Sequence, residues 1–131
     1  MPIESKLTRN GRVIYQHYLD PLDMRDVLAH FQKYQSEILD HATAPVHIIT
    51  DTTGLTRLPS HILSGGMSTI RHSHPMGGQI VIVAQGGFIH AMAQVFQRMA
   101  KNQPVTVVHT LDEAWAYVDK LLASESAGTN G

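Results

Sequence analysis

The sequence predicts an α/β domain in which a mostly parallel five-stranded sheet is flanked by four helices. Short apolar, β-branched runs occur five times along the chain, and an amphipathic stretch of helical length follows four of them. The last cycle is the clearest, because Val105 to His109 is typical of a strand and Thr110 to Glu113 forms a capping box at a helix start. Strands that alternate with helices of this length build parallel sheets with covering helices.

An N-terminal β-hairpin is predicted before the β-α units. Residues 3–8 and 12–19 are compatible with strands and flank an Asn10-Gly11 pair, which is a strong hairpin signal. The Asp20-Pro21 pair suits the cap and the first position of a helix. Apolar residues at helical spacing extend that helix over about 22–42.

Two more strands and two more helices complete the predicted order. Val46 to Asp51 is β-branched on both faces, as expected of a strand inside a parallel sheet. Ser60 is placed to cap a short helix over about 61–71. Residues 79–84 form the most apolar strand and are therefore predicted to be central, and the helical pattern of 88–99 follows them.

Length, charge and composition predict one cytoplasmic domain. The chain has 131 residues, 43% of them apolar, and a formal net charge of −1, which gives no overall attraction to nucleic acid. The longest apolar run, Ile80 to Ala84, is too short for stable membrane insertion. The absence of cysteine excludes disulfides and thiolate metal sites. We expect a single domain over 1–123 and a flexible C-terminal tail over 124–131, because the tail is small and polar.

Three segments carry a resemblance to a known family: Val46 to Leu55, Gln79 to Gly87, and Thr110 to Trp115. In this order the chain resembles STAS domains, the SpoIIAA-like family of anti-sigma-factor antagonists, and in particular the bacterial proteins placed beside both STAS and CRAL-TRIO lipid-binding domains. The resemblance spans Gly11 to Leu122. It implies a SpoIIAA-like fold and a non-enzymatic regulatory or protein-interaction module with a protein partner and no cofactor.

The resemblance also implies a site. STAS phospho-switches carry an aspartate followed by a phosphoacceptor serine at the start of the second helix. Ser60 falls on the acceptor position, but Pro59 stands where the family has the aspartate. Without that acid, an N-cap that stabilises the helix by about 1 kcal/mol is the simpler interpretation of Ser60. The candidate partner-facing or phosphoacceptor surface comprises Asp51, Thr53, Arg57, Ser60, His61 and Ser64.

Metal and catalytic sites are not predicted, although the chain has nine histidines. His72 and His74 form the only close pair, and His61 or His90 could approach from neighbouring elements, but the spacing places no third ligand. A Gly-x-Ser-x-Gly elbow, a Walker lysine and a His-Glu-x-x-His motif are all absent from the sequence. We therefore expect neither an enzyme nor a metal protein.

An alternative function stays open beside the interaction module. The CRAL-TRIO resemblance implies a domain that binds a small apolar ligand or a lipid in a cavity beneath the second helix. Leu58, Ile62, Met67 and Ile70 are the predicted lining, although stripes of this kind are more often plain core. A homodimer through a strand edge or a helix face is also left open.

Overall fold

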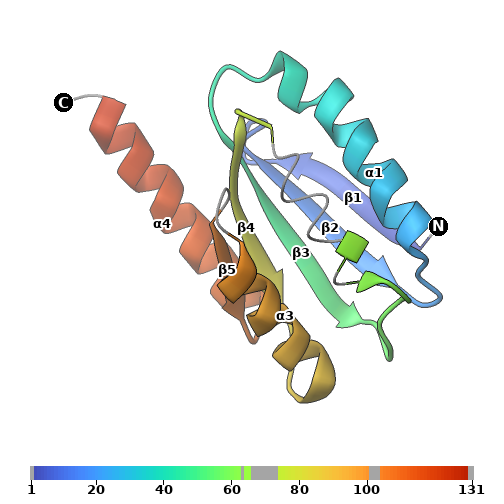
Figure 1. Ribbon diagram of the computed structural model, residues 1–131. Helices are drawn as coiled ribbons and strands as arrows, with labels where there is room; N and C mark the ends of the chain where they lie inside the picture. Colours follow the sequence, from blue (N-terminus) through green and yellow to red (C-terminus); the bar gives the residue numbers. More distant parts are fainter. Residues whose placement is uncertain (1, 63, 66–73, 101–103, 130–131) are drawn as a thin grey trace.

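A five-stranded sheet in the order β1-β2-β3-β4-β5 forms the centre of the molecule (Figure 1). The structure is a computed structural model that describes residues 2–62, 64–65, 74–100 and 104–129. Its elements are β1 (Ile3–Thr8), β2 (Val13–Leu19), α1 (Met24–Glu37), the 3-10 turn η1 (Leu39–His41), β3 (Val46–Gly54), β4 (Gly77–Val83), α3 (Gly87–Met99), β5 (Val105–Val108) and α4 (Leu111–Thr129).

The α/β class is confirmed, and the sheet is mixed. β1 and β2 form the predicted antiparallel hairpin, whose turn includes Asn10 and Gly11 at φ of 57° and 82°. The pairs β2–β3, β3–β4 and β4–β5 are parallel. The most apolar strand, β4, is paired on both edges, but β3 is the middle strand. The described residues contain three α-helices where four were predicted, since most of the segment 61–71 lies outside them.

The first helix begins later than predicted and ends earlier. Asp23 is its N-cap, and a capping box links Asp23 with Asp26. The carboxylate of Asp20, the predicted cap, instead accepts hydrogen bonds from the backbone N–H and the hydroxyl of Thr56 at 2.8 and 2.5 Å. Helix α1 ends at Glu37, so the predicted helix over 22–42 is a 14-residue helix followed by η1.

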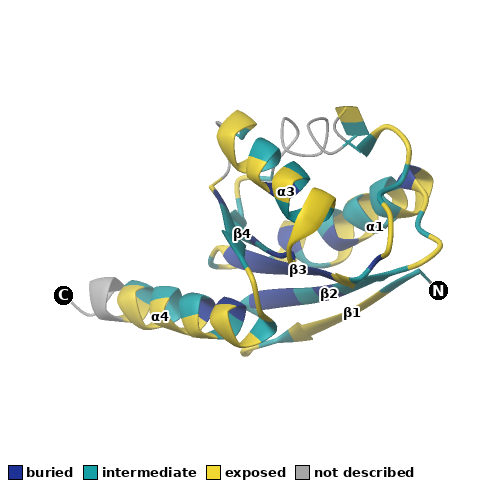
Figure 2. Ribbon diagram, turned by 90° about the horizontal axis from the view of Figure 1, so that it is seen from below, coloured by how far each residue is buried: buried dark blue, intermediate teal, exposed yellow. Residues whose placement is uncertain are grey.

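The sheet has a covered face on each side (Figure 2). Helix α4 lies on one side, and α1 and α3 lie on the other. Side chains alternate along a strand, so the two faces draw on alternate residues. Val13, Ile49 and Val81 pack with Val118 of α4, whereas Ile14 and Ile48 pack on the α1 side. This alternation decides which strand residues can line a site on either face.

The last helix begins where the sequence predicts and continues further. The Thr110 hydroxyl accepts a hydrogen bond from the Glu113 backbone N–H at 3.1 Å, which confirms the Thr110 half of the capping box. Helix α4 extends to Thr129 and so continues into the segment 124–131, which was predicted to be a flexible tail. Glu125 contacts two residues of the sheet region, and these contacts hold the end of the helix against the domain. None of the helices in the described part of the chain has the length and apolar character of a membrane span.

Candidate ligand pocket

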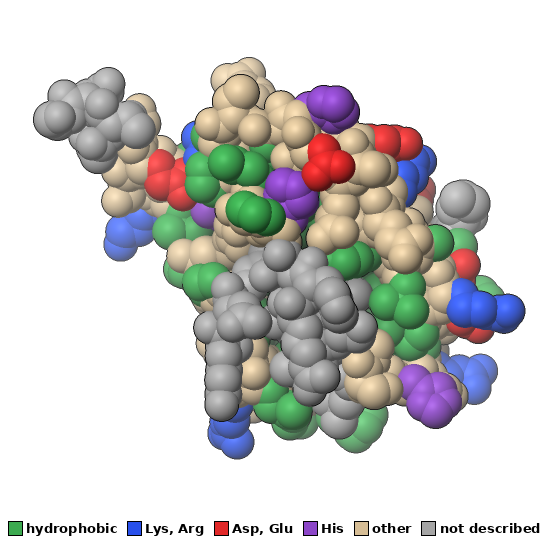
Figure 3. All heavy atoms as spheres, turned by 45° about the horizontal axis from the view of Figure 1, so that its top comes forward, with side chains coloured by type: hydrophobic (Ala, Val, Ile, Leu, Met, Phe, Trp, Pro, Cys, Tyr) green, Lys and Arg blue, Asp and Glu red, His purple; other side chains and the backbone are tan. Residues whose placement is uncertain are grey.

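An apolar pocket lies between the sheet and the helices α1 and α3. It has a volume of about 140 Å³. In the space-filling view of Figure 3, hydrophobic side chains are visible in several separate groups on this side of the molecule, and most charged side chains lie near the outline. The helices and the loops around them contribute Leu22, Met24, Val27, Phe31, Tyr34, Leu55, Leu58, Ile62, Ile89, Met92, Ala93 and Phe96. The sheet contributes Gln16, Tyr18, Ile48, Thr50, Thr52, Ile80, Ile82 and Val105.

The sheet side of the pocket follows from strand alternation. On β3, Thr50 and Thr52 face the same side as Ile48, and on β4 Ile80 and Ile82 line the pocket. Each of these residues is two positions from the next, so all project toward α1 and α3. The pocket is therefore built by the sheet face that α4 does not cover.

The polar part of the pocket centres on Gln16. Its register partner on β3 is Thr50, and the Gln16 side-chain Nε2 donates a hydrogen bond to the Thr50 hydroxyl at 2.8 Å. Gln16 is only 5% exposed, and its other amide atom, Oε1, is buried without a hydrogen-bond partner. An unpaired buried acceptor of this kind is uncommon in folded proteins, because it loses its hydrogen bonds to water and gains none in return.

Two tyrosines also line the pocket. Burial raises the pKa of Tyr18 above its usual value, and burial followed by the proximity of Tyr18 raises the pKa of Tyr34. Both phenols are therefore neutral near pH 7. Among the described lining residues there is no aspartate, glutamate, histidine, lysine or arginine. A charged group that entered this pocket would find no opposite charge among these described residues.

Of the residues predicted to line such a cavity, two are confirmed. Leu58 and Ile62 belong to the lining, while Met67 and Ile70 lie outside the described residues. The sequence reasoning missed Gln16. The signal that could have found it is a polar side chain on the same strand face as Ile14, where apolar residues are the rule.

The structure does not bring all residues of the predicted partner-facing or phosphoacceptor surface together. Asp51 is 4% exposed and lies on the opposite face of the sheet from the pocket, so its assignment to an outer surface is wrong. Its carboxylate accepts hydrogen bonds from the Tyr15 hydroxyl at 2.8 Å and from the Thr53 hydroxyl and backbone N–H at 2.6 and 3.0 Å. Burial, followed by the bond to Asp51, raises the pKa of Tyr15 to about 12. Thr53 is exposed at the end of β3.

Three of the predicted surface residues do meet. Arg57, Ser60 and His61 line one cleft together with the start of α1. The carbonyl of His61 accepts hydrogen bonds from the Ser64 hydroxyl at 3.3 Å and the Gly65 backbone N–H at 2.9 Å. The helical turn thus begins after His61. Ser60, the predicted cap, lies one residue too early to occupy the capping position.

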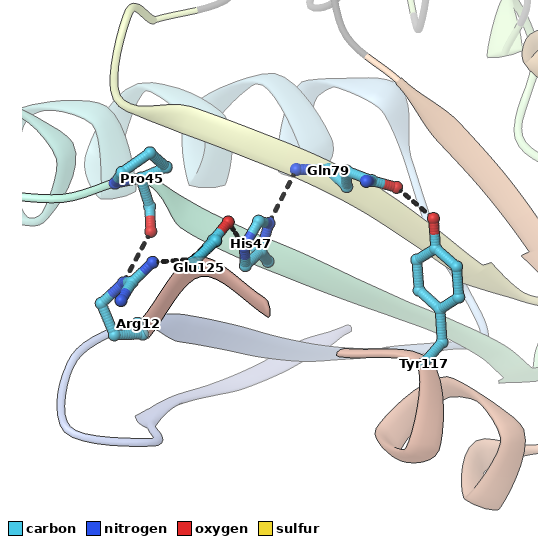
Figure 4. Close-up of polar contacts among 6 residues, drawn as sticks. All are labelled: Arg12, Pro45, His47, Gln79, Tyr117 and Glu125. Carbon is cyan, nitrogen blue, oxygen red and sulfur yellow. Dashed lines mark hydrogen bonds and ion pairs between the residues drawn. The ribbon is translucent and has the colours of Figure 1, made fainter. Parts of the chain in front are cut away.

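A second polar cluster joins the end of α4 to the sheet (Figure 4). The His47 ring is 3% exposed, its Nδ1 accepts from the Gln79 backbone N–H at 2.9 Å, and its Nε2 lies 2.8 Å from Glu125 Oε1. Since Nδ1 acts as an acceptor, Nε2 carries the proton and donates to Glu125. Arg12 forms an ion pair with Glu125 and donates to the Pro45 carbonyl at 2.9 Å. This cluster is fully engaged within the chain and leaves His47 no open ligand position.

The histidines predicted as potential metal ligands are spread out. His74 Nε2 bonds to Asp40 at 2.7 Å, His90 stacks on His109 with ring centroids 4.6 Å apart, and His72 lies outside the described residues. In the described part of the chain, no three residues of the His, Asp and Glu types are grouped to hold a metal ion.

No protein-family model matches this chain, and no curated protein matches it closely enough to count as a relative. The resemblance to STAS and SpoIIAA-like domains therefore stays a prediction from the sequence.

Proposed function

We propose that this chain is a non-enzymatic domain that binds a small, uncharged and mostly apolar molecule in the pocket between the sheet and helices α1 and α3. The observation that carries the proposal is the pocket itself. Its lining is apolar apart from a few hydroxyl groups and one amide, and it includes Leu58 and Ile62, two of the four residues that the sequence analysis assigned to a ligand cavity.

The volume of the pocket limits the size of the ligand. Drug-sized molecules occupy pockets of about 300–1,000 Å³, whereas an apolar protein cavity of about 150 Å³ accommodates benzene. At about 140 Å³, this pocket fits a single ring or a short aliphatic chain. A whole lipid would have to leave most of its chain outside.

The chemistry of the lining favours binding over catalysis. General acid-base catalysis is most effective when the pKa of the acting group lies near the working pH. The ionisable groups in the described lining are Tyr18 and Tyr34, and burial moves their pKa values upward, away from neutrality. The same lack of charge disfavours an ionised ligand, because a buried charge without a partner is strongly destabilised.

A regulatory module of the SpoIIAA-like type, with a fourth helix over 61–71 and a protein partner, is the second candidate function. One observation supports it: Arg57, Ser60 and His61, three residues of the predicted partner-facing surface, line one cleft. That cleft shares Leu22, Met24 and Leu58 with the ligand pocket. A partner that docks at the cleft would therefore contact side chains that a ligand also contacts.

Toluene tests the proposed function, because it is apolar and of the right size. Titration of the ¹⁵N-labelled protein should shift backbone resonances of α3 and the facing strands, with a Kd of about 0.1–1 mM, a range reasonable for a ligand of so few atoms. Ala93 is 5% exposed and lines the pocket. The substitution Ala93→Leu fills the cavity and should abolish the shifts.

Ala91 provides the matched control. It lies on the exposed side of the same helix, so Ala91→Leu makes the same chemical change outside the pocket and should leave toluene binding intact. The proposal fails if toluene produces no saturable shifts in the wild-type protein, or if Ala93→Leu and Ala91→Leu bind it equally well.

A further inference from the structure

The unpaired amide oxygen of Gln16 indicates what kind of ligand the pocket takes. Gln16 is 5% exposed, and its Oε1 has no hydrogen-bond partner. Such an atom has lost its hydrogen bonds to water without gaining one in the protein. A ligand that brings a donor to Oε1 supplies a hydrogen bond, and a purely apolar ligand does not.

The surroundings of Gln16 hold the amide at the edge of the pocket. The strand pairing sets Gln16 opposite Thr50, and the bond from Nε2 to the Thr50 hydroxyl engages the other end of the amide. Oε1 has almost no surface open to water. Because Gln16 is one of the lining residues, a molecule bound in the pocket lies beside this amide.

We infer that the natural ligand is a neutral molecule with a small apolar body and one hydrogen-bond donor, such as a phenol or an alcohol, whose O–H donates to Oε1 of Gln16. The inference rests on the proposed function and goes one step further, because it assigns a polar group and its partner. Tyr18 and Tyr34 line the same pocket without introducing a charge, so an ionised ligand is disfavoured.

The test compares phenol, which has an O–H donor, with anisole, in which a methyl group replaces that hydrogen. Their Kd values are measured by NMR titration with the wild-type protein and with Gln16→Met, a substitution that keeps the approximate size of the side chain and removes the amide. The ratio of the two Kd values is then compared between the proteins. Since the same two molecules leave the same solvent, their different hydration cancels from this comparison.

We expect the preference for phenol over anisole to be about tenfold greater in the wild-type protein than in Gln16→Met, which corresponds to one hydrogen bond to an otherwise unpaired acceptor. Equal preferences in the two proteins would overturn the inference. Toluene should bind Gln16→Met about as well as it binds the wild type, which checks that the variant keeps its pocket.

A measurement on the wild-type protein keeps the test independent of the variant. The Cδ resonance of Gln16 should shift with phenol and stay in place with anisole or toluene; a shift of similar size with all three would also overturn the inference. The two proposals fail separately. If toluene does not bind the wild type, the proposed function is wrong, whereas if toluene binds and phenol gains nothing from Gln16, only the donor assignment is wrong.

Discussion

Removal of the Glu125 carboxylate tests a contact that the structure shows and that the sequence did not predict. The sequence places Glu125 in a flexible tail over 124–131, where its substitution would have no effect. In the structure it accepts from the buried His47 ring at 2.8 Å and pairs with Arg12. The substitution Glu125→Ala therefore leaves a buried imidazole N–H without its acceptor.

The expected loss follows from the burial of the two partners. A hydrogen bond to a charged group contributes about 1.5–3 kcal/mol. The His47 side chain is 3% exposed, but that of Glu125 is 34% exposed, so water can replace part of the lost acceptor. The pair with Arg12 is partly exposed as well and adds less than about 1 kcal/mol. We expect Glu125→Ala to lower the free energy of unfolding by about 1–2 kcal/mol.

Urea denaturation, followed by circular dichroism, measures this loss. Ser124→Ala is the control, because Ser124 is the exposed neighbour on the same helix, and it should be neutral or slightly stabilising. Glu125→Gln keeps an acceptor without the charge and should fall between the wild type and Glu125→Ala. If Glu125→Ala and Ser124→Ala have the same stability, the contact between α4 and His47 does not stabilise the fold and the reasoning is refuted.

Two further predictions concern a half-buried histidine, His30, and a buried aspartate, Asp51. Burial, followed by the charge of Lys33, lowers the pKa of His30, so the unfolded chain takes up this proton at higher pH and stability should fall as the pH drops below about 6.5. Between about pH 7.5 and about pH 5.5, the urea midpoint should change less in His30→Phe than in His41→Phe, a control that replaces an exposed histidine and keeps His30. Equal changes in the two variants would contradict the lowered pKa of His30. The buried Asp51 accepts three hydrogen bonds, so Asp51→Ala should lower the free energy of unfolding by about 2–3 kcal/mol. A loss below about 0.5 kcal/mol, typical of surface positions, would show that the Asp51 carboxylate lies at the surface after all.

The elements of the fold could be read from local patterns. The Asn10-Gly11 turn, the alternation of β-branched runs with helical stretches, and the Thr110 cap are each confirmed by the structure. These signals act over a few neighbouring residues, through backbone preference and one or two hydrogen bonds. At the first helix the local signal was wrong. Asp20 was the predicted cap, but Asp23 is the N-cap, and the Asp20 carboxylate instead accepts hydrogen bonds from Thr56, far along the chain.

The candidate site could be predicted only in part. Leu58 and Ile62 were expected from their apolar character beside the second helix, and they line the pocket. Gln16 was not expected, because its pairing with Thr50 depends on the register between β2 and β3. Nor was Glu125 expected to face His47, since their bond joins positions 78 residues apart.

The sequence alone determined the order of strands and helices, because that order depends on side-chain periodicity and on caps and turns within a few residues. Tertiary structure decided which residues meet. The parallel register of β2 and β3 set Gln16 beside Thr50 under α1 and α3. Alternation along β3 turned the next residue, Asp51, to the opposite face of the sheet. The register itself depends on how both faces of the sheet pack, which neither strand determines alone.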